Sequence, residues 1–364
     1  MSTGPDATPT PITPLEGVAP YTPPPIDPRL DLFLDANEGP APPDAALDAL
    51  RTLDPEALRR YARPERLESE LATTLGVTPA RVVVTAGADD AIDRTCRAML
   101  DRDRALLVHT TTFEMIERYA SLTGARIDRV GWFDGRFPVD AMLDAITDRT
   151  RLVALVSPNN PTGASIPTDA MLDIVRATRR VGALVMVDLA YAEFADEDPT
   201  PALLEEPNLI VLRTFSKARG LAGARVGYAV CPERVAPWIR ASGGPYPVSA
   251  PSLALASASL RDDGSLAETV TRIRINRGRL ITALAERGVR VLPSDANFVA
   301  AIVEDPGSAR QSFAERGIAI RTMPDKPGLE RLVRITIPGD DAALTRVLDA
   351  VDAAFQREIK GAAT

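Results

Sequence analysis

Few residues of this chain can act as soft metal ligands or as histidine-type general bases. The sequence of 364 residues contains one histidine, His109, and two cysteines, Cys96 and Cys231. One histidine argues against a histidine-based catalytic triad and against a multi-histidine metal site. The two cysteines form no spaced set, so we expect neither a disulfide framework nor a zinc cluster, and no other metal site is indicated.

Excess positive charge and long apolar runs are also missing. The formal net charge is −8 at pH 7 and no basic run is present, which argues against a protein that binds a nucleic-acid backbone. No apolar run reaches membrane-spanning length, and the chain shows no signal-peptide pattern. With 45% hydrophobic and 25% charged residues, the composition is typical of a globular enzyme, and we expect a soluble cytoplasmic protein.

Lysine is the third scarce residue. Only Lys217, Lys326 and Lys360 are lysines among 42 basic residues, and the other 39 are arginines. Arginine can replace lysine on a solvated surface, but it cannot lose its proton and attack a carbonyl group. Lys326 falls in a Pro/Gly-rich loop and Lys360 in the C-terminal tail, where we expect solvated charges. Lys217 instead follows the apolar run 209–212, which predicts a lysine at the mouth of a buried strand.

The neighbours of Lys217 favour a covalently held cofactor. The hydroxyls of Thr214 and Ser216 precede it and the cation of Arg225 follows it. This set suits a Schiff base to pyridoxal phosphate (PLP), with Ser216, Arg225 and backbone N–H groups holding the phosphate. From these residues alone, a glycine-rich strand-to-strand loop with an incidental lysine is the alternative.

Apolar runs and amphipathic helices alternate from residue 81 onward. Continuous apolar strands between helices indicate a largely parallel sheet covered on both faces, whose ligands bind at the carboxyl ends of the strands. The expected strands are 82–85, 105–108, 126–130, 151–156, 184–187, 209–212 and 226–230. After residue 247 one or two long helices over 249–288 are expected, followed by short strands at 298–303, 318–321 and 332–337. The predicted fold class is therefore α/β, with a mostly parallel central sheet plus a smaller α+β domain.

Polar residues follow two of these strands in turns that can present them to a ligand. Gly87-Ala88-Asp89 comes after the first strand and opens a helix, where backbone N–H groups can approach a phosphate. The alternative there is a capped helix start with Asp89 as the N-cap residue. In Ser157-Pro-Asn-Asn-Pro-Thr-Gly163, the prolines and the glycine predict a rigid turn that presents Asn160, whose amide can bind a phenolate oxygen.

A carboxylate ends a third strand. Asp188 follows the apolar run 184–187, with Tyr191 three residues further on. Burying a carboxylate is costly unless a cation pairs with it, and the pyridinium nitrogen of PLP is such a cation. A helix-capping role is the alternative for Asp188. The phosphate turn, the amide, the Asp–Tyr pair and the rare lysine occur at separate strand ends, and together they favour a PLP site.

At this point the chain resembles the fold-type I PLP-dependent aminotransferases over about residues 30–357, and within them most closely the histidinol-phosphate aminotransferases (class I/II). The motifs that carry the resemblance are Leu34-Asp-Ala-Asn-Glu-Gly39, Arg60-Tyr61, Ala86-Gly-Ala-Asp-Asp90, residues 157–163, Asp188-Leu-Ala-Tyr191, Thr214-Phe-Ser-Lys217 with Gly220-Leu-Ala-Gly223 and Arg225, and Arg334-Ile-Thr336. The resemblance implies transamination of histidinol phosphate with 2-oxoglutarate, by a ping-pong route through a Lys217 aldimine, in histidine biosynthesis.

The resemblance also implies a role for individual residues. Lys217 is the expected catalytic residue. The cofactor-binding residues are expected to be Ala88, Asp89, Phe113, Asn160, Asp188, Tyr191, Thr214, Ser216, Lys217 and Arg225, with Tyr61 supplied by the partner subunit of a homodimer with shared active sites. The substrate-binding residues are expected to be Tyr21, Asn37, Arg321 and Arg334. For Arg321, a surface ion pair with Asp325 is the alternative.

The expected domain boundaries follow from the same comparison. They are a mobile Pro-rich arm at 1–28, a segment at 29–65 that joins the small domain and the dimer interface, a large PLP-binding domain at 66–248 and a small domain at 249–364. The arm contains nine prolines and one conspicuous aromatic residue, Tyr21. A PLP-sensing regulator would need a helix-turn-helix domain, for which residues 1–28 are too short and too rich in proline.

Three positions depart from the family pattern. Phe113 stands where a tyrosine usually stacks on the cofactor, Leu189 where an acidic residue is usual, and Arg219 where an aromatic or small residue is usual. The last two, Leu189 and Arg219, leave open an aminotransferase for an aromatic or other amino acid in specialised metabolism. A PLP-dependent decarboxylase of a phosphorylated amino acid is the other alternative.

Overall fold

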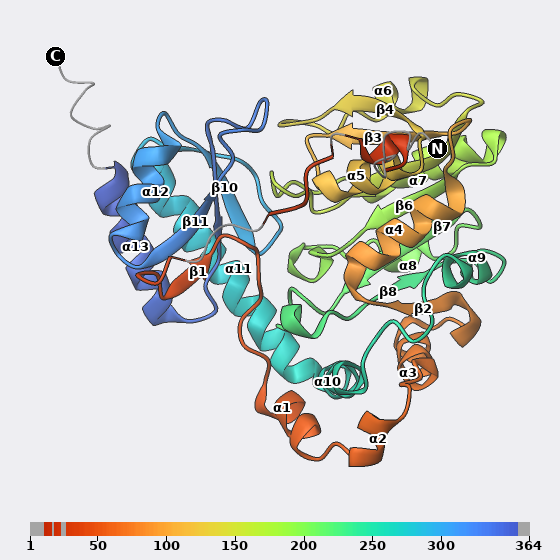
Figure 1. Cartoon of the computed structure of the whole chain (residues 1–364). Coiled ribbons are helices and arrows are strands. Elements are labelled where there is room, and N and C mark those ends of the chain that lie inside the picture. Colours follow the sequence, from red (N-terminus) through yellow and green to blue (C-terminus); the bar gives the residue numbers. More distant parts are fainter. Residues whose placement is uncertain (1–10, 17, 23–26, 356–364) are drawn as a thin grey trace, which may run out of the picture.

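The computed structural model describes residues 11–16, 18–22 and 27–355. Much of the expected Pro-rich arm, and Lys360, therefore lie outside the described residues. The described chain contains two sheets, a larger one and a smaller one, which lie side by side with helices around each (Figure 1). No helix among the described residues is both long enough and apolar enough to cross a membrane.

The larger sheet has seven strands in the order β2-β8-β7-β6-β5-β3-β4. All neighbouring pairs are parallel except those of β8, which runs antiparallel to both β2 and β7. The predicted largely parallel sheet is thus confirmed. Its strands are β2 (Val82–Thr85), β3 (Ala105–Thr110), β4 (Arg126–Gly131), β5 (Thr150–Val156), β6 (Leu184–Asp188), β7 (Leu209–Thr214) and β8 (Gly227–Val230).

Helices cover both faces of this sheet because its strands are apolar at consecutive positions. Val185 and Val187 of β6 contribute to one core cluster, whereas Leu184 and Met186 contribute to the cluster on the opposite face. Successive side chains of a strand point to opposite faces, so only a sheet buried on both sides accommodates such a run. The first face packs against α3 (Glu65–Leu75), α6 (Val139–Asp144), α7 (Thr168–Thr178) and α10 (Ala250–Leu260); the second packs against α4 (Gly87–Met99), α5 (Glu114–Leu122) and α9 (Ala236–Ala241).

The smaller sheet has five strands in the order β1-β11-β12-β10-β9, and an N-terminal strand forms one of its edges. β1 pairs in parallel with β11, and the remaining pairs are antiparallel. Its strands are β1 (Leu32–Leu34), β9 (Arg290–Val291), β10 (Phe298–Ile302), β11 (Ile318–Thr322) and β12 (Leu332–Thr336). The sheet packs against α11 (Asp263–Ala285), α12 (Pro306–Ala314) and α13 (Asp341–Phe355).

The long helical region after residue 249 is two helices, α10 and α11. Asp262 separates them, and its carboxylate accepts a hydrogen bond from the backbone N–H of Ser265, which caps α11. Short elements without a clear hydrophobic period were missed by the sequence reading. These are α2 (Pro55–Arg59), α8 (Thr200–Leu203), α9 and β9; α1 spans Asp44–Arg51.

The segment between β1 and α1, residues 35–43, is the crossing segment: it leads from the smaller sheet to α1, which lies beside α10 (Figure 1). It passes directly over the loop that follows β7. A Cβ atom at Gly39 would overlap the carbonyl oxygen of Lys217, and one at Gly220 would overlap the carbonyl oxygen of Pro40. Only glycine fits at these two positions, so the crossing segment lies in backbone contact with the loop that carries the rare lysine.

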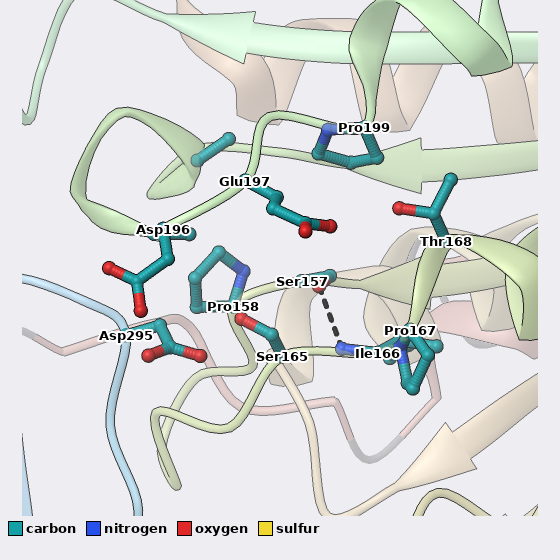
Figure 2. Close-up of a pocket in the computed structure, with 12 residues that line it drawn as sticks. Ser157, Pro158, Ser165, Ile166, Pro167, Thr168, Asp196, Glu197, Pro199 and Asp295 are labelled. Carbon is teal, nitrogen blue, oxygen red and sulfur yellow. Dashed lines mark hydrogen bonds between the residues drawn. The ribbon is translucent and has the colours of Figure 1, made fainter.

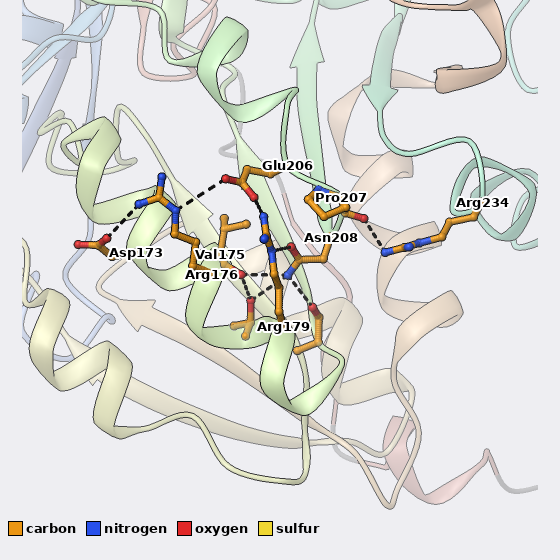
Figure 3. Close-up of polar contacts among 10 residues, drawn as sticks. Asp173, Val175, Arg176, Arg179, Glu206, Pro207, Asn208 and Arg234 are labelled. Carbon is orange, nitrogen blue, oxygen red and sulfur yellow. Dashed lines mark hydrogen bonds and ion pairs between the residues drawn. The ribbon is translucent and has the colours of Figure 1, made fainter.

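Asn208 ties the end of α7 to the start of β7 (Figure 3). Its Nδ2 atom lies 3.1 Å from the Val175 carbonyl oxygen, 3.1 Å from the Thr178 hydroxyl and 3.2 Å from the Ala183 carbonyl oxygen. Its Oδ1 atom accepts a hydrogen bond of 3.3 Å from Arg179. The side chain thereby donates both to a carbonyl in the last turn of α7 and to the Ala183 carbonyl just before β6.

We expect Asn208→Ala to lower the free energy of unfolding by about 2–3 kcal/mol, because buried carbonyl groups lose their donor. Urea unfolding followed by circular dichroism measures the change. Arg234→Ala is the control, since it removes one exposed hydrogen bond of 2.7 Å to the Pro207 carbonyl oxygen and should change stability by about 0.5 kcal/mol or less. Equal midpoints for the two variants would contradict the assignment.

Candidate active site

A cavity of about 1110 Å³ lies between the carboxyl ends of the large-sheet strands and the smaller sheet. Every residue predicted for the site lines it, except Tyr61. These residues are Tyr21, Asn37, Ala88, Asp89, Phe113, Asn160, Asp188, Tyr191, Thr214, Ser216, Lys217, Arg225, Arg321 and Arg334. The structure thus brings the predicted residues together, while their individual roles stay predictions.

Lys217 extends from the loop after β7 into the cavity. Its Nζ atom donates a hydrogen bond of 3.2 Å to the carbonyl oxygen of Ala36 and lies 5.6 Å from the ring centroid of Tyr191. The cavity walls screen the half-buried amine from bulk water. Desolvation, with repulsion from the Arg334 guanidinium, lowers the pKa of Lys217 to about 8. A substantial fraction of this amine is therefore neutral and nucleophilic near neutral pH.

Asp188 is a buried carboxylate without a cationic partner among the described residues. It ends β6, and its Oδ1 atom accepts a hydrogen bond of 3.0 Å from the backbone N–H of Ala190. Burial raises the pKa of Asp188 to about 7. A ligand that placed a protonated ring nitrogen at this carboxylate would supply the missing cation, which fits the pyridine nitrogen of PLP.

Hydroxyls, a guanidinium and a helix N-terminus meet at another end of the cavity. Thr214 donates a hydrogen bond of 2.9 Å to the Ser216 hydroxyl, and the Arg225 guanidinium lies 3.3 Å from the Asp89 carboxylate. Gly87 has a positive φ of 83°, which favours glycine, and its lack of a side chain leaves room for the tip of Arg225. This donor set, with the first N–H groups of α4, fits a phosphate group.

Asp89 is not the N-cap residue of α4. It is the third residue of the helix, and Ala86 occupies the N-cap position. The backbone N–H of Ala86 donates a hydrogen bond of 2.8 Å to the carboxylate of Asp90. The capping alternative considered for Asp89 is therefore wrong.

Two arginines from neighbouring strands line the same cavity as Lys217. Arg321 of β11 and Arg334 of β12 are directly paired in the antiparallel register. Arg334 is buried and donates to the Asn160 side-chain oxygen (2.6 Å) and to the Asp35 carbonyl oxygen (2.8 Å), both neutral acceptors. Its Nε atom has no partner among the described residues, and desolvation lowers the pKa of Arg334 to about 10.

Arg321 makes no side-chain hydrogen bond or ion pair with any residue that the structure describes, so the expected alternative pair with Asp325 is not formed. Two guanidinium groups without a carboxylate partner would be stabilised by an anion in the cavity, because a bidentate guanidinium suits both carboxylate and phosphate.

The sequence reading missed several charged residues of the cavity wall. Lys326, expected to be a solvated charge, lines the cavity and forms an ion pair with Glu114 at the start of α5. Arg129 and Glu117 form a second pair at 2.7 Å. No sequence signal joins Lys326 to Glu114, because the two residues lie far apart along the chain.

The three residues that depart from the family pattern, and Tyr61, lie in different parts of the structure. Phe113 lines the cavity, but Leu189 is buried in the core of the large sheet. Arg219 points away from the cavity and donates to the Ser259 carbonyl oxygen. Tyr61 is 79% exposed and stacks on Tyr246 with a centroid distance of 4.6 Å.

A second, smaller cavity of about 210 Å³ lies behind the Ser157–Pro158 turn (Figure 2). Its lining includes the carboxylates of Asp196, Glu197 and Asp295 and none of the predicted site residues. Among the described residues, no group of three or more histidine, cysteine or acidic side chains has an arrangement that could hold a metal ion.

The chain is similar to known proteins over most of its length. The family Aminotransferase class I and II matches residues 32–351. The chain is 37% identical over 360 residues to the histidinol-phosphate aminotransferase of Roseiflexus castenholzii, covering 94% of this chain and 95% of that protein. It is 35% identical over 338 residues to that of Xylella fastidiosa, covering 89% and 90%. The solved histidinol-phosphate aminotransferase of Sinorhizobium meliloti, in complex with pyridoxal-5'-phosphate, matches with a TM-score of 0.85 at 27% identity, covering 96% and 99%.

In the cofactor-free protein, we expect the rate at which an acylating reagent modifies the Lys217 amine to reach half of its maximum at pH about 8. An unfolded lysine reaches this point at about 10.4. The lowered pKa makes the Lys217 amine neutral at a lower pH than an unfolded lysine. Its labelling should therefore rise as the pH passes about 8. Competitive labelling with peptide mass spectrometry measures the midpoint.

Arg334→Met should move the midpoint of Lys217 upward, because it removes a nearby positive charge. The same peptide in urea is the unfolded reference. A midpoint near the reference in the folded wild-type protein would contradict the assignment.

Proposed function

This chain belongs to the class I and II aminotransferases, and on that basis we propose that it transfers the amino group of histidinol phosphate to 2-oxoglutarate. The observation that carries the substrate assignment is the pair Arg321 and Arg334. Both line the cavity that contains Lys217, and neither has a carboxylate partner among the described residues. Such a pair suits the phosphate of the donor and the carboxylates of the acceptor in turn. The relatives named above carry the same activity in their names.

The cofactor is pyridoxal 5'-phosphate. When bound, PLP stabilises negative charge at the substrate carbon that bears the amino group. The residues proposed to hold it are Asp188 at the ring nitrogen, Asn160 and Tyr191 at the ring oxygen, and the Thr214–Ser216 turn with Arg225 and the start of α4 at the phosphate.

Other side chains of the cavity are proposed to transfer the proton, orient the substrate and stack on the cofactor. Lys217 Nζ, with its lowered pKa, is proposed to take the proton from the reacting carbon of the substrate and to return it. Arg321 and Arg334 orient the substrate by its anionic group and leave the reacting carbon beside Lys217. Phe113, on the cavity wall, is proposed to stack on the cofactor ring.

We expect wild-type kcat/KM to be larger for histidinol phosphate than for histidinol, by about 10–100-fold for each lost contact to the phosphate. Arg321→Ala should remove most of this preference, whereas Arg321→Lys, which keeps the charge but not the bidentate geometry, should retain part of it. Phenylalanine and glutamate complete the panel of donors, measured as half-reactions by absorbance.

The outcomes separate the alternatives. If phenylalanine is as good a donor as histidinol phosphate, the assignment to histidine biosynthesis fails while the aminotransferase assignment stands. Carbon dioxide release from a phosphorylated amino acid, without a need for a 2-oxo acid, would indicate a decarboxylase instead.

We also propose a homodimer with shared active sites and the domain division expected from the sequence, 66–248 and 249–364, in a cytoplasmic enzyme. Tyr61 supports the shared site because it is exposed, stacks on Tyr246 and does not line the cavity of its own chain. The pairing of β1 with β11 supports a role for residues 29–65 in joining the small domain.

Mixing two inactive variants tests the shared site. We expect Lys217→Ala and Tyr61→Ala each to lose activity, and a mixture that is unfolded and refolded together to recover it. The mixed dimer has one site with Lys217 from one subunit and Tyr61 from the other, so it should reach about a quarter of the wild-type activity at equal amounts, because half of the dimers are mixed and each has one intact site.

Each variant refolded alone is the control. No recovery in the mixture, with dimers present by sedimentation, would show that Tyr61 does not act across the interface. An active wild-type monomer would overturn the dimer itself.

A further inference from the structure

Asn37, in the crossing segment between β1 and α1, is buried, and hydrogen bonds fix both its backbone and its side chain. It is 1% exposed and adopts a left-handed backbone with φ of 55°. Asparagine is one of the few residues besides glycine that occupy this region readily. Its backbone N–H donates a hydrogen bond of 3.0 Å to the Thr336 hydroxyl, and its carbonyl oxygen accepts one of 3.2 Å from Asn297.

The same threonine fixes the orientation of the Asn37 carboxamide. The Thr336 hydroxyl accepts from the Asn37 backbone, and it donates its own proton to Asn37 Oδ1 at 3.3 Å. The carboxamide oxygen faces Thr336 and accepts the single proton of its hydroxyl. The nitrogen is consequently on the other side, where Asn37 Nδ2 donates a hydrogen bond of 3.0 Å to the Tyr191 hydroxyl.

The orientation of the Asn37 carboxamide sets the hydrogen-bonding role of the Tyr191 hydroxyl. Its hydroxyl oxygen accepts from Asn37, and no described residue accepts the phenolic proton. The ring is itself fixed, because it is 5% exposed and packs edge-on against Phe298 with a centroid distance of 5.3 Å. Tyr191 lines the cavity beside Lys217, so its proton remains available to an acceptor in the cavity.

We infer that Asn37 is a positioning residue that makes Tyr191 a hydrogen-bond donor toward an anionic oxygen of the ligand in the cavity. The inference rests on the proposed function, in which this oxygen is the ring oxygen of PLP, and it goes beyond the substrate contact expected for Asn37 from the sequence. The charged groups that act on the Tyr191 hydroxyl are Arg334, Asp188 and Asp89, and Lys217 lies over its ring.

The test compares two substitutions of Asn37, each made both in the wild-type protein and in the Tyr191→Phe variant. Asn37→Gly keeps the left-handed backbone and removes the donor without adding charge. Asn37→Asp places an acceptor where the donor stood, so that the phenolic proton turns toward residue 37. The readouts are the pH midpoint of the visible absorbance of the PLP-loaded protein and the dissociation constant of PLP.

With Tyr191 present, both substitutions should raise the absorbance midpoint. Asn37→Gly frees the Tyr191 hydroxyl to turn away, and Asn37→Asp attracts its proton, so both weaken the hydrogen bond that Tyr191 would donate to the anionic ring oxygen. That oxygen would then be more basic and would titrate at higher pH. Asn37→Asp should raise the midpoint by about one pH unit more with Tyr191 than in the Tyr191→Phe background, and should weaken PLP binding by about tenfold. The field of the new carboxylate is present in both backgrounds and cancels in this difference.

In the Tyr191→Phe background, Asn37→Gly should leave the midpoint unchanged. The inference is overturned if Asn37→Gly shifts the midpoint equally in both backgrounds, or in neither. Asn37→Gly decides the question if Asn37→Asp does not fold. If the wild-type protein takes up no PLP, the proposed function fails; if it binds and titrates normally while the substitutions show no coupling to Tyr191, the positioning role alone fails.

Discussion

Three consecutive residues of the crossing segment touch three of the polar groups that face the cavity, and the site depends on this contact. The carbonyl oxygens of Asp35 and Ala36 accept hydrogen bonds from Arg334 and Lys217, and the amide of Asn37 binds Tyr191. The contact is possible because the backbones of the segment and of the lysine loop approach without an intervening Cβ. A single stretch of chain therefore sets the relative positions of groups from both sheets.

The charged groups of the cavity share an electrostatic property. Asp188, Lys217 and Arg334 each have a pKa displaced toward the neutral form, mainly because of burial, and none has an ion-pair partner among the described residues. Holding ionisable groups in this way carries a desolvation cost. A ligand with a ring cation, a reactive carbonyl group and an accompanying anion removes that cost at all three positions, which explains why the site suits PLP together with an acidic substrate.

Much of this could be predicted from the sequence because it depends on local pattern. The apolar runs of β5, β6 and β7 marked the parallel strands, and the rule that ligands bind at strand ends located Asn160, Asp188 and Lys217 correctly in one cavity. The ion pair of Lys326 with Glu114 and the bonding of Asn37 could not be predicted. They depend on how segments far apart in the sequence meet, and neither charge pattern nor period records that.

The hydrogen bonds between Asn37 and Thr336 bear on the order in which parts of the chain can fold. The Thr336 hydroxyl that orients the Asn37 carboxamide lies 299 positions later in the chain, on the last strand of the smaller sheet. The large sheet is complete at residue 230, so its core can form while the ribosome is still adding the following helices. Asp35 and Asn37 have their partners Arg334 and Thr336 only after residue 336 has emerged. The cavity that contains Lys217 is thus among the last features of the protein to form during synthesis.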